Sequence, residues 1–267
     1  MSEKKGLDRL VLKSLACFLM LLDHIGYKFW AHGAVFLYFR MAGRAAFPIF
    51  AFMLAEGASK SKNKPRYLLR LLLFGLITEP FFDRCFYKTW FHAGSLNVMF
   101  TLALGLIAIF SFRLIKKEAG GKTGSASFFI TLAALICPVM AAIAAELLGT
   151  DYGMYGVALM FLYGITDRSS AGGKALTVAV TFGFGARFLL LYELKNLLAI
   201  LSLTAAPEPP AQWLLQQIYA AAALIPLLLY NGSRGPEIRS RAGKAAVKYG
   251  FYAFYPVHLL ILILISG

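Results

Sequence analysis

Residues 93–117 read AGSLNVMFTLALGLIAIFSFRLIKK, an apolar run that ends at two lysines. Its length matches the ~20 residues that a helix needs to cross the hydrocarbon core of a bilayer. Backbone polar groups in lipid must find partners within their own segment, so the run predicts a helix. The strict alternation of polar and apolar residues that is typical of barrel strands is absent. This stretch therefore predicts a transmembrane helix.

Similar apolar runs recur along the whole 267-residue chain, which is 59% hydrophobic and 15% charged. The mean hydropathy of +0.68 is high for a soluble domain of this size. We expect membrane segments over Leu7–Trp30, Ala34–Ala58, Tyr67–Phe82, Ala93–Ile115, Ala126–Leu148, Tyr152–Thr166, Ala175–Leu191, Leu214–Tyr230 and Ala245–Ile265. The sequence thus predicts an all-α, polytopic transmembrane helical bundle of about nine to ten segments, in one domain that covers residues 1–267.

Basic residues lie between the apolar runs and predict the orientation of the chain. There are 27 basic against 13 acidic residues, for a net charge of +14. Cytoplasmic loops collect lysine and arginine, so the bilayer is the expected partner and nucleic acid is not. The basic clusters alternate correctly when the amino terminus is cytoplasmic. The short piece Leu197–Leu203 is then re-entrant or interfacial, which leaves nine full spans, or ten if one boundary is misplaced.

Ionisable side chains inside membrane helices are costly and are therefore candidates for function. His24 lies next to Asp23, and a histidine near a carboxylate suits general-base catalysis. The alternative is a structural histidine that bonds a neighbouring helix. Consecutive helical residues point about 100° apart, so we expect Asp23 to pair with an arginine from another helix. Lys13 shares the face of His24 about three turns earlier, and either lines an internal channel or reaches the inner headgroups.

Two arginines of the second segment, Arg40 and Arg44, are four residues apart and share a face. Two such charges in a membrane segment need partners, and Asp23 and Glu79 are expected at a similar depth. One interpretation is that the arginines anchor ion pairs. The other is that they stabilise an oxyanion or hold a phosphate.

Further polar groups lie in the predicted fourth and last segments. Asn97 and Thr101 are one turn apart and can hydrogen-bond across helices. His258 follows a proline in the last segment, at a depth comparable with that of His24. No third ligand accompanies these two histidines, and the cysteines lack the spacing of a metal site, so no metal is expected.

Several blocks of sequence resemble TraX family proteins. They are LKSLA at 12–16 with DHIG at 23–26, GRAAFPIFAF at 43–52, NVMFTL at 97–102, DYG at 151–153 and FYPVH at 254–258. TraX is associated with amino-terminal acetylation of a conjugative pilin, and the family is grouped with transmembrane acyltransferases that use cytosolic acyl-CoA. The first helix is also similar to that of the type-three acyltransferases, whose histidine is matched by His24 and whose arginine is replaced by Lys13.

The resemblance implies a membrane acetyltransferase of the bacterial plasma membrane. His24 would be the general base, and Arg40 or Arg44 would stabilise the charge that develops on the thioester. Asp23 would orient the site, and His258 would be an acid/base or supporting partner.

The implied donor is acetyl-CoA, and the acceptor is an unidentified peptide amine, sugar or small molecule. We expect Lys13 and Asn97 to contact the donor within the membrane, with Arg66 and Arg70 holding its phosphates at the inner surface. From the buried charges alone, a transporter or channel with a polar intramembrane pathway would rank first, and a non-catalytic membrane scaffold is a further alternative.

Overall fold

A computed structural model describes residues 6–29, 33–118, 120, 123–201, 216–233 and 235–266 of the chain. Every regular element in these ranges is a helix, which confirms the predicted all-α class. The chain divides into two compact units. Unit 1 comprises Met1–Ile49 and Asp167–Pro236, and unit 2 comprises Phe50–Thr166 and Glu237–Gly267. The predicted single domain stays a prediction.

Unit 1 is built from helices at both ends of its sequence. These are α1 (Arg9–Phe29), α2 (Ala34–Gly43), the start of α3 (Ala46–Lys60), α8 (Ala171–Leu201), the 3₁₀ helix η2 (Ile218–Ala223) and α10 (Leu224–Leu229). In this unit α1 packs on α2, and η2 packs on both α8 and α2. The backbone of Leu7 bonds the chain after α10, donating to Leu229 O at 2.9 Å and accepting from Asn231 N at 2.9 Å. The start of α1 is thereby fixed to the end of α10.

Two glycines allow α1 and α2 to approach each other closely. A Cβ at Gly43 would lie 2.3 Å from the Asp23 Cβ, and a Cβ at Gly26 would lie 2.6 Å from the carbonyl oxygen of Phe36. Small residues at such contacts let membrane helices approach until their backbones touch. The close approach brings Asp23 on α1 within reach of two arginine side chains, Arg40 in the last turn of α2 and Arg44 directly after it.

We expect Gly43→Ala to destabilise the protein, because its methyl group would overlap Asp23 and force the two helices apart. Overpacking of this kind costs roughly 1–3 kcal/mol. The measurement is the midpoint of thermal unfolding of the purified protein in detergent. Gly183→Ala in α8 is the matched control, since a Cβ there meets no atom within 4 Å. Equal midpoints for the two variants would contradict the close helix contact.

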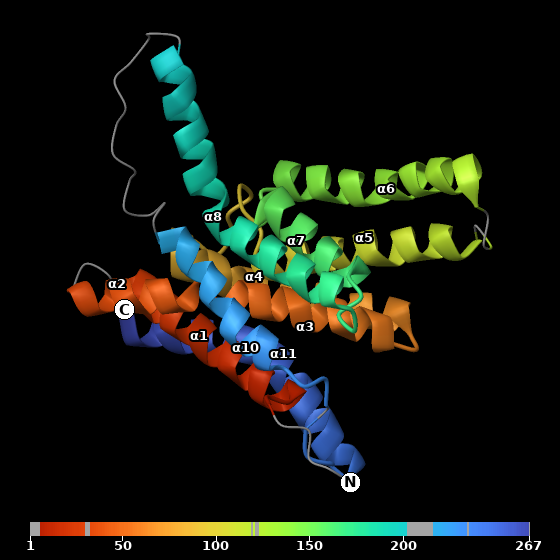
Figure 1. Ribbon diagram of the computed structural model, residues 1–267. Helices are drawn as coiled ribbons and strands as arrows, with labels where there is room; N and C mark the ends of the chain where they lie inside the picture. The colour runs from red at the N-terminus through yellow and green to blue at the C-terminus, as the bar shows by residue number, and fades with distance from the viewer. Residues whose placement is uncertain are drawn as a thin grey trace. The chain divides into compact units, whose positions relative to one another are not determined.

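Unit 2 contains the rest of α3 and five further helices. They are α4 (Lys64–Tyr87), α5 (Val98–Glu118), α6 (Gly124–Leu147), α7 (Gly153–Ile165) and α11 (Arg241–Ser266). Figure 1 shows α5, α6 and α7 side by side, and each of these three helices contacts the other two. On the other side of α5 lies α4, which also packs on α11. The rings of Phe74 and Tyr252 stack with centroids 5.1 Å apart between these last two helices.

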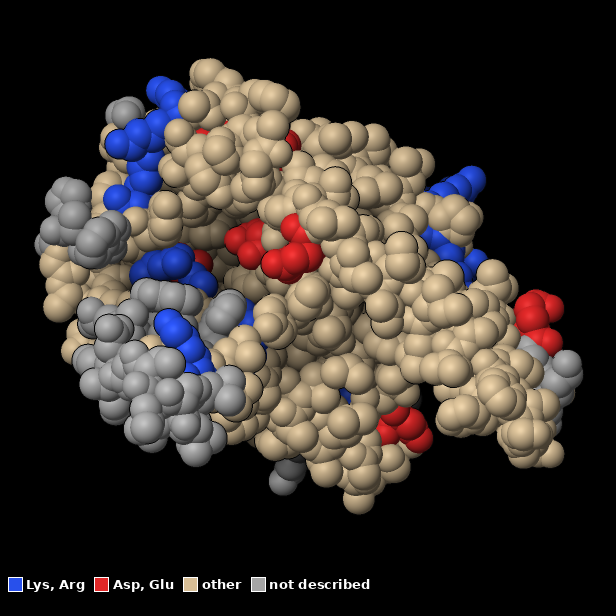
Figure 2. Space-filling view, turned by 90° about the horizontal axis from the view of Figure 1, so that it is seen from above, with Lys and Arg blue, Asp and Glu red and all other residues tan. Residues whose placement is uncertain are grey.

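Among the described residues, five helical stretches are long and apolar enough to cross a membrane, with α2 and α3 together counted as one, Ala34–Lys60. A sixth would be the pair Ala171–Arg187 and Leu189–Asn196, bent by 58°. Figure 2 shows a face on which most side chains are uncharged. Large apolar side chains such as Leu76, Phe128 and Ile136 are exposed on the helices, as expected for lipid-facing surfaces. The chain is therefore a multi-pass membrane protein.

The predicted count of nine to ten spans is not confirmed. Helix α4 is long enough to cross a membrane, but its charged residues make it too polar for a typical membrane span. Helix α7 has only 13 residues. A helix of that length covers roughly 20 Å, less than the ~30 Å hydrocarbon core. The other short apolar segment is Ile218–Leu229.

Several predicted boundaries were wrong. The second segment is one candidate span, Ala34–Lys60, which ends two residues later than predicted and has a break at Arg44–Ala45 between α2 and α3. The third does not end at Phe82, since α4 continues to Tyr87. The fourth begins at Val98, five residues later than predicted, and α8 extends to Leu201 into the piece predicted to be re-entrant. Trp30, residues 31–32, the rest of that piece and the start of the eighth segment lie outside the described residues.

Thr89 and Lys117 should lie on opposite sides of the membrane. Thr89 is exposed in the loop between α4 and α5, and Lys117 is exposed in the last turn of α5. We expect an impermeant thiol reagent to label Thr89→Cys in intact cells and to label Lys117→Cys only after lysis, because basic ends stay cytoplasmic. The reverse pattern would overturn the orientation. The native Cys85 cannot report it, because the side chain is only 3% exposed.

Candidate functional site

The most tightly paired charges of unit 1 surround Asp23. Its Oδ2 accepts from Arg40 Nη1 at 2.6 Å and from Arg44 Nη2 at 2.7 Å, and its Oδ1 accepts from Arg44 Nη2 at 2.6 Å. Arg40 also donates to the Asp23 carbonyl oxygen and lies over the ring of Tyr27. The Asp23 and Arg44 side chains are 11% and 12% exposed. Both expectations are confirmed: Asp23 pairs with arginines from another helix, and the two arginines anchor ion pairs.

This cluster carries two positive charges against one negative charge. The Arg44 guanidinium lies in a largely buried place, and the Arg40 side chain is 21% exposed. Fixed positive charge in a site of low dielectric stabilises negative charge that develops nearby. The cluster formed by Asp23, Arg40 and Arg44 can therefore favour an anion or an oxyanion next to it.

His24 follows Asp23 in α1, and its side chain is buried. Lys13, Cys17 and His24 belong to one uninterrupted helix, so Lys13 lies roughly 16 Å before His24 along the axis, as predicted. Lys13 is half-buried, and Cys17 is buried between the two. The roles of these residues in catalysis and donor binding stay predictions.

In unit 2, Asn97 joins the start of α5 to α4. Its Nδ2 donates to Glu79 Oε2 and to Gly75 O at 2.9 Å, its backbone N–H donates to Glu79 Oε2 at 3.2 Å, and its Oδ1 accepts from Met99 N at 2.9 Å. Asn97 thus begins α5 and bonds across helices, as expected. Glu79 Oε2 lies at the amino-terminal end of α5, where the positive end of the helix dipole stabilises a negative charge.

The beginning of α4 is basic. Asn63 begins the helix by accepting from Arg66 N at 2.9 Å, and the Arg66 side chain is exposed. Arg70, one turn later, lies over the Tyr67 ring and interacts with the hydroxyl of Tyr252 on α11. Within the described part of the chain, Arg70 Nε is buried and contacts no acceptor. Guanidinium groups in this arrangement can bind the oxygens of a phosphate.

Two residues of α11 carry buried polar side chains. His258 is buried, and its Nδ1 lies 2.8 Å from Phe254 O, a carbonyl near the proline of this helix. Tyr255, one turn before, is buried with its hydroxyl near the backbone of Val98 and within electrostatic range of Glu79. His258 thus belongs to unit 2, whereas His24 belongs to unit 1.

The predicted third segment ended at Phe82, one residue before Asp83, and Tyr255 was assigned no role. Asp83 is a helical residue four positions after Glu79, and this spacing of two acids was the signal available in the sequence. Within the described ranges, no group of three or more His, Cys, Asp or Glu side chains is placed to hold a metal ion.

Comparison with known proteins gives two matches. The family model described as TraX protein matches residues 8–266. The chain is also 30% identical over 277 residues to the protein named "Probable fimbrial assembly protein FimC, serogroup H1" of Dichelobacter nodosus, an alignment that covers 98% of this chain and 97% of that protein. No solved structure matches the chain.

Proposed function

The chain belongs to the TraX family, and on this premise we propose that it is a membrane-embedded acetyltransferase of the bacterial plasma membrane. It moves an acetyl group from cytosolic acetyl-CoA to an amine or hydroxyl acceptor at or beyond the membrane. The observation that supports this best is a buried histidine, His24, that follows directly in α1 after Asp23, whose carboxylate pairs with Arg40 and Arg44.

The proposed reaction needs a base and a means of stabilising negative charge. His24 removes the proton from the acceptor as its nitrogen or oxygen attacks the thioester carbonyl. A carbon–nitrogen or carbon–oxygen bond forms, the carbon–sulfur bond breaks, and the sulfur leaves as the thiol of CoA after it takes up a proton. Arg40 and Arg44, held in place by Asp23, stabilise the oxyanion of the tetrahedral intermediate. General-base catalysis contributes about 10²–10⁴-fold, and positioning contributes much of the rest.

The donor has several phosphate charges that cannot enter hydrocarbon unaided, so they stay near the cytoplasmic surface. Arg66 and Arg70, at the basic beginning of α4, are suited to bind them. Lys13 lies near the beginning of α1 and is half-buried, which suits contact with the donor within the membrane. His258 is proposed as a supporting group in unit 2.

The test is release of CoA and transfer of labelled acetyl by the purified protein, compared with a His24→Ala variant. Acetyl transfer that depends on His24 supports the proposal. A pure, folded protein that transfers no acetyl to any peptide amine, and instead moves ions or solutes across proteoliposomes, would replace it with the transporter.

A further inference from the structure

Two adjacent aromatic side chains, Trp90 and Phe91, form an exposed tip on the loop between α4 and α5. Trp90 is 60% exposed and Phe91 is 79% exposed, and the neighbouring Tyr87 at the end of α4 is 40% exposed. Aromatic side chains have large apolar surfaces, and removing these surfaces from water is favourable. This aromatic tip is therefore suited to contact apolar material outside the loop.

The first half of the loop is fixed to α4. Lys88 takes the left-handed backbone conformation, with φ 60° and ψ 14°, which a non-glycine residue rarely adopts. Arg84 in the last turn of α4 donates from Nη1 to Lys88 O at 2.8 Å, and its guanidinium lies over the Trp90 ring, 5.6 Å from the centroid. Arg84 thus holds both the turn and the indole ring.

The second half of the loop folds back on the same helix. His92 N donates to Asp83 Oδ2 at 2.7 Å, and the rings of His92 and Tyr87 stack with centroids 4.0 Å apart. Within the loop, Thr89 Oγ1 donates to Phe91 O at 3.1 Å. The aromatic tip is therefore presented by a loop that is bonded to α4 at both ends, and its exposure is a feature of the folded chain.

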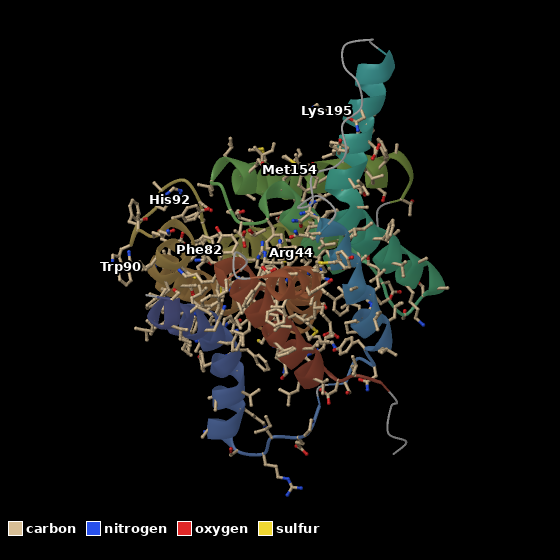
Figure 3. The ribbon with its side chains drawn as sticks, turned by 90° about the vertical axis from the view of Figure 1, so that its left-hand side faces the viewer. Arg44, Phe82, Trp90, His92, Met154 and Lys195 are labelled. Atoms are coloured by element: carbon tan, nitrogen blue, oxygen red, sulfur yellow. The ribbon has the colours of Figure 1, made fainter. Side chains whose placement is uncertain are left out.

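The direction of Trp90 indicates what surrounds the tip. Figure 1 shows α5 and α6, two of the candidate spans, running across the view, and Figure 3, turned by 90° about the vertical axis, looks along them. In this second view Trp90 lies at the edge of unit 2, farther out than Phe82 and directed away from the helices. At a membrane surface, a side chain directed along the spans meets water, whereas one directed sideways meets the headgroup region of the lipid.

We propose that the loop between α4 and α5 is an interfacial anchor, in which Trp90 and Phe91 insert between the headgroups and the acyl chains of the leaflet where α4 ends. Tryptophan favours this boundary, because its ring system contacts the chains while its N–H stays near the polar headgroups. Phe91 adds apolar surface, and the exposed Lys88 can place its ammonium group among the lipid phosphates. The anchor does not depend on the proposed acetyl transfer.

The anchor accounts for the placement of the polar end of α4 in the bilayer. Asp83 and Arg84 lie close to this end, in a helix that is too polar for a typical span. Charged side chains are costly in hydrocarbon and much less so near the headgroups. Asp83 is bonded to the loop through His92 N, and Arg84 contacts the Trp90 ring. An aromatic tip held in the interface therefore keeps both charges near the headgroups.

The experiment measures tryptophan fluorescence of the full-length protein in nanodiscs of phosphatidylglycerol. The chain has three tryptophans, so Trp30→Phe with Trp213→Phe leaves Trp90 alone. We expect lipids brominated close to the headgroup to quench Trp90 more strongly than lipids brominated at the chain ends, and acrylamide in the water to quench it weakly. Strong quenching by acrylamide without quenching by brominated lipid would overturn the anchor. Shielding from both quenchers would mean that a protein surface, such as a second copy of the chain, covers the tip, and would also overturn it.

Lys62→Trp, in a variant whose three native tryptophans are replaced by phenylalanine, is the matched control. Lys62 is exposed in the polar loop between α3 and α4. Its indole should be quenched mainly by acrylamide, because a polar loop stays in water. Equal quenching of the two positions by brominated lipid would mean that the Trp90 signal reflects only nearness to the bilayer, and this result would contradict insertion of the tip.

Stability in the bilayer gives a second readout. Trp90→Ser with Phe91→Ser should lower the unfolding midpoint in nanodiscs by at least about 2 °C, because the shorter polar side chains do not insert. Trp90→Tyr with Phe91→Tyr should keep the midpoint, since tyrosine also favours the interface. A serine variant as stable as the unmodified protein would refute the anchor. A tyrosine variant that lost as much as the serine variant would assign the two rings to packing within the loop instead.

Discussion

Asp23→Ala should be among the most destabilising single substitutions in unit 1. The change leaves the guanidinium groups of Arg40 and Arg44 close together without the carboxylate that separates them. Removing one partner from a buried ion pair costs roughly 3–5 kcal/mol, because the remaining charge is buried and uncompensated. The measurement is the unfolding midpoint of the purified variant, together with the fraction that elutes as a monodisperse species.

Glu56→Ala is the matched control for this substitution. Glu56 pairs with Lys60 at 2.6 Å, but the Lys60 side chain is 41% exposed. An exposed pair one turn apart on a helix contributes about 0.3–0.5 kcal/mol, so its loss should barely shift the midpoint. Replacing both arginines by methionine together with Asp23→Leu should recover most of the stability, since no buried charge then remains. An Asp23→Ala protein as stable as the Glu56→Ala protein would contradict the account of a buried cluster.

The sequence was sufficient to predict the membrane class and most helices, because long apolar runs have few structures open to them in lipid. Helices α6, α7 and α11 begin and end within four residues of the predicted bounds. The pairing of Asp23 was also predictable, since helical geometry turns it away from His24 and a buried charge needs an opposite charge.

The break at Arg44–Ala45 was not predictable, because the apolar pattern continues across it. The end of α4 was missed for the opposite reason. Asp83 and Arg84 look like loop residues by hydropathy, but the returning loop supplies His92 N and Lys88 O as their hydrogen-bond partners within the fold. The hydropathy pattern of a segment does not show hydrogen-bond partners that residues outside the segment supply. The acidic spacing of Glu79 and Asp83 was not predicted because the third segment was expected to end at Phe82, before Asp83.

His24→Ala should lower the rate of acetyl transfer by at least about 10²-fold, because the acceptor would lose the base that takes its proton. The purified variant should remain monodisperse, and its affinity for acetyl-CoA should be unchanged if His24 acts on the acceptor. Lys13→Ala should show the opposite pattern, with weaker acetyl-CoA binding, and Lys13→Arg should restore that binding by restoring the charge. Radiolabelled acetyl transfer and calorimetric binding of acetyl-CoA measure the two effects separately.

Cys17→Ala is the matched control on the same helix. Cys17 is buried between Lys13 and His24, so this substitution perturbs the packing of α1 without removing a charge or a base. Its transfer rate should stay close to that of the unmodified protein. If Cys17→Ala lost as much activity as His24→Ala, the effect would lie in the packing of α1, and the base would have to be sought elsewhere. If His24→Ala lost acetyl-CoA binding while Lys13→Ala kept it, the donor would lie against the His24 end of α1, and the proposed direction of donor entry would be reversed.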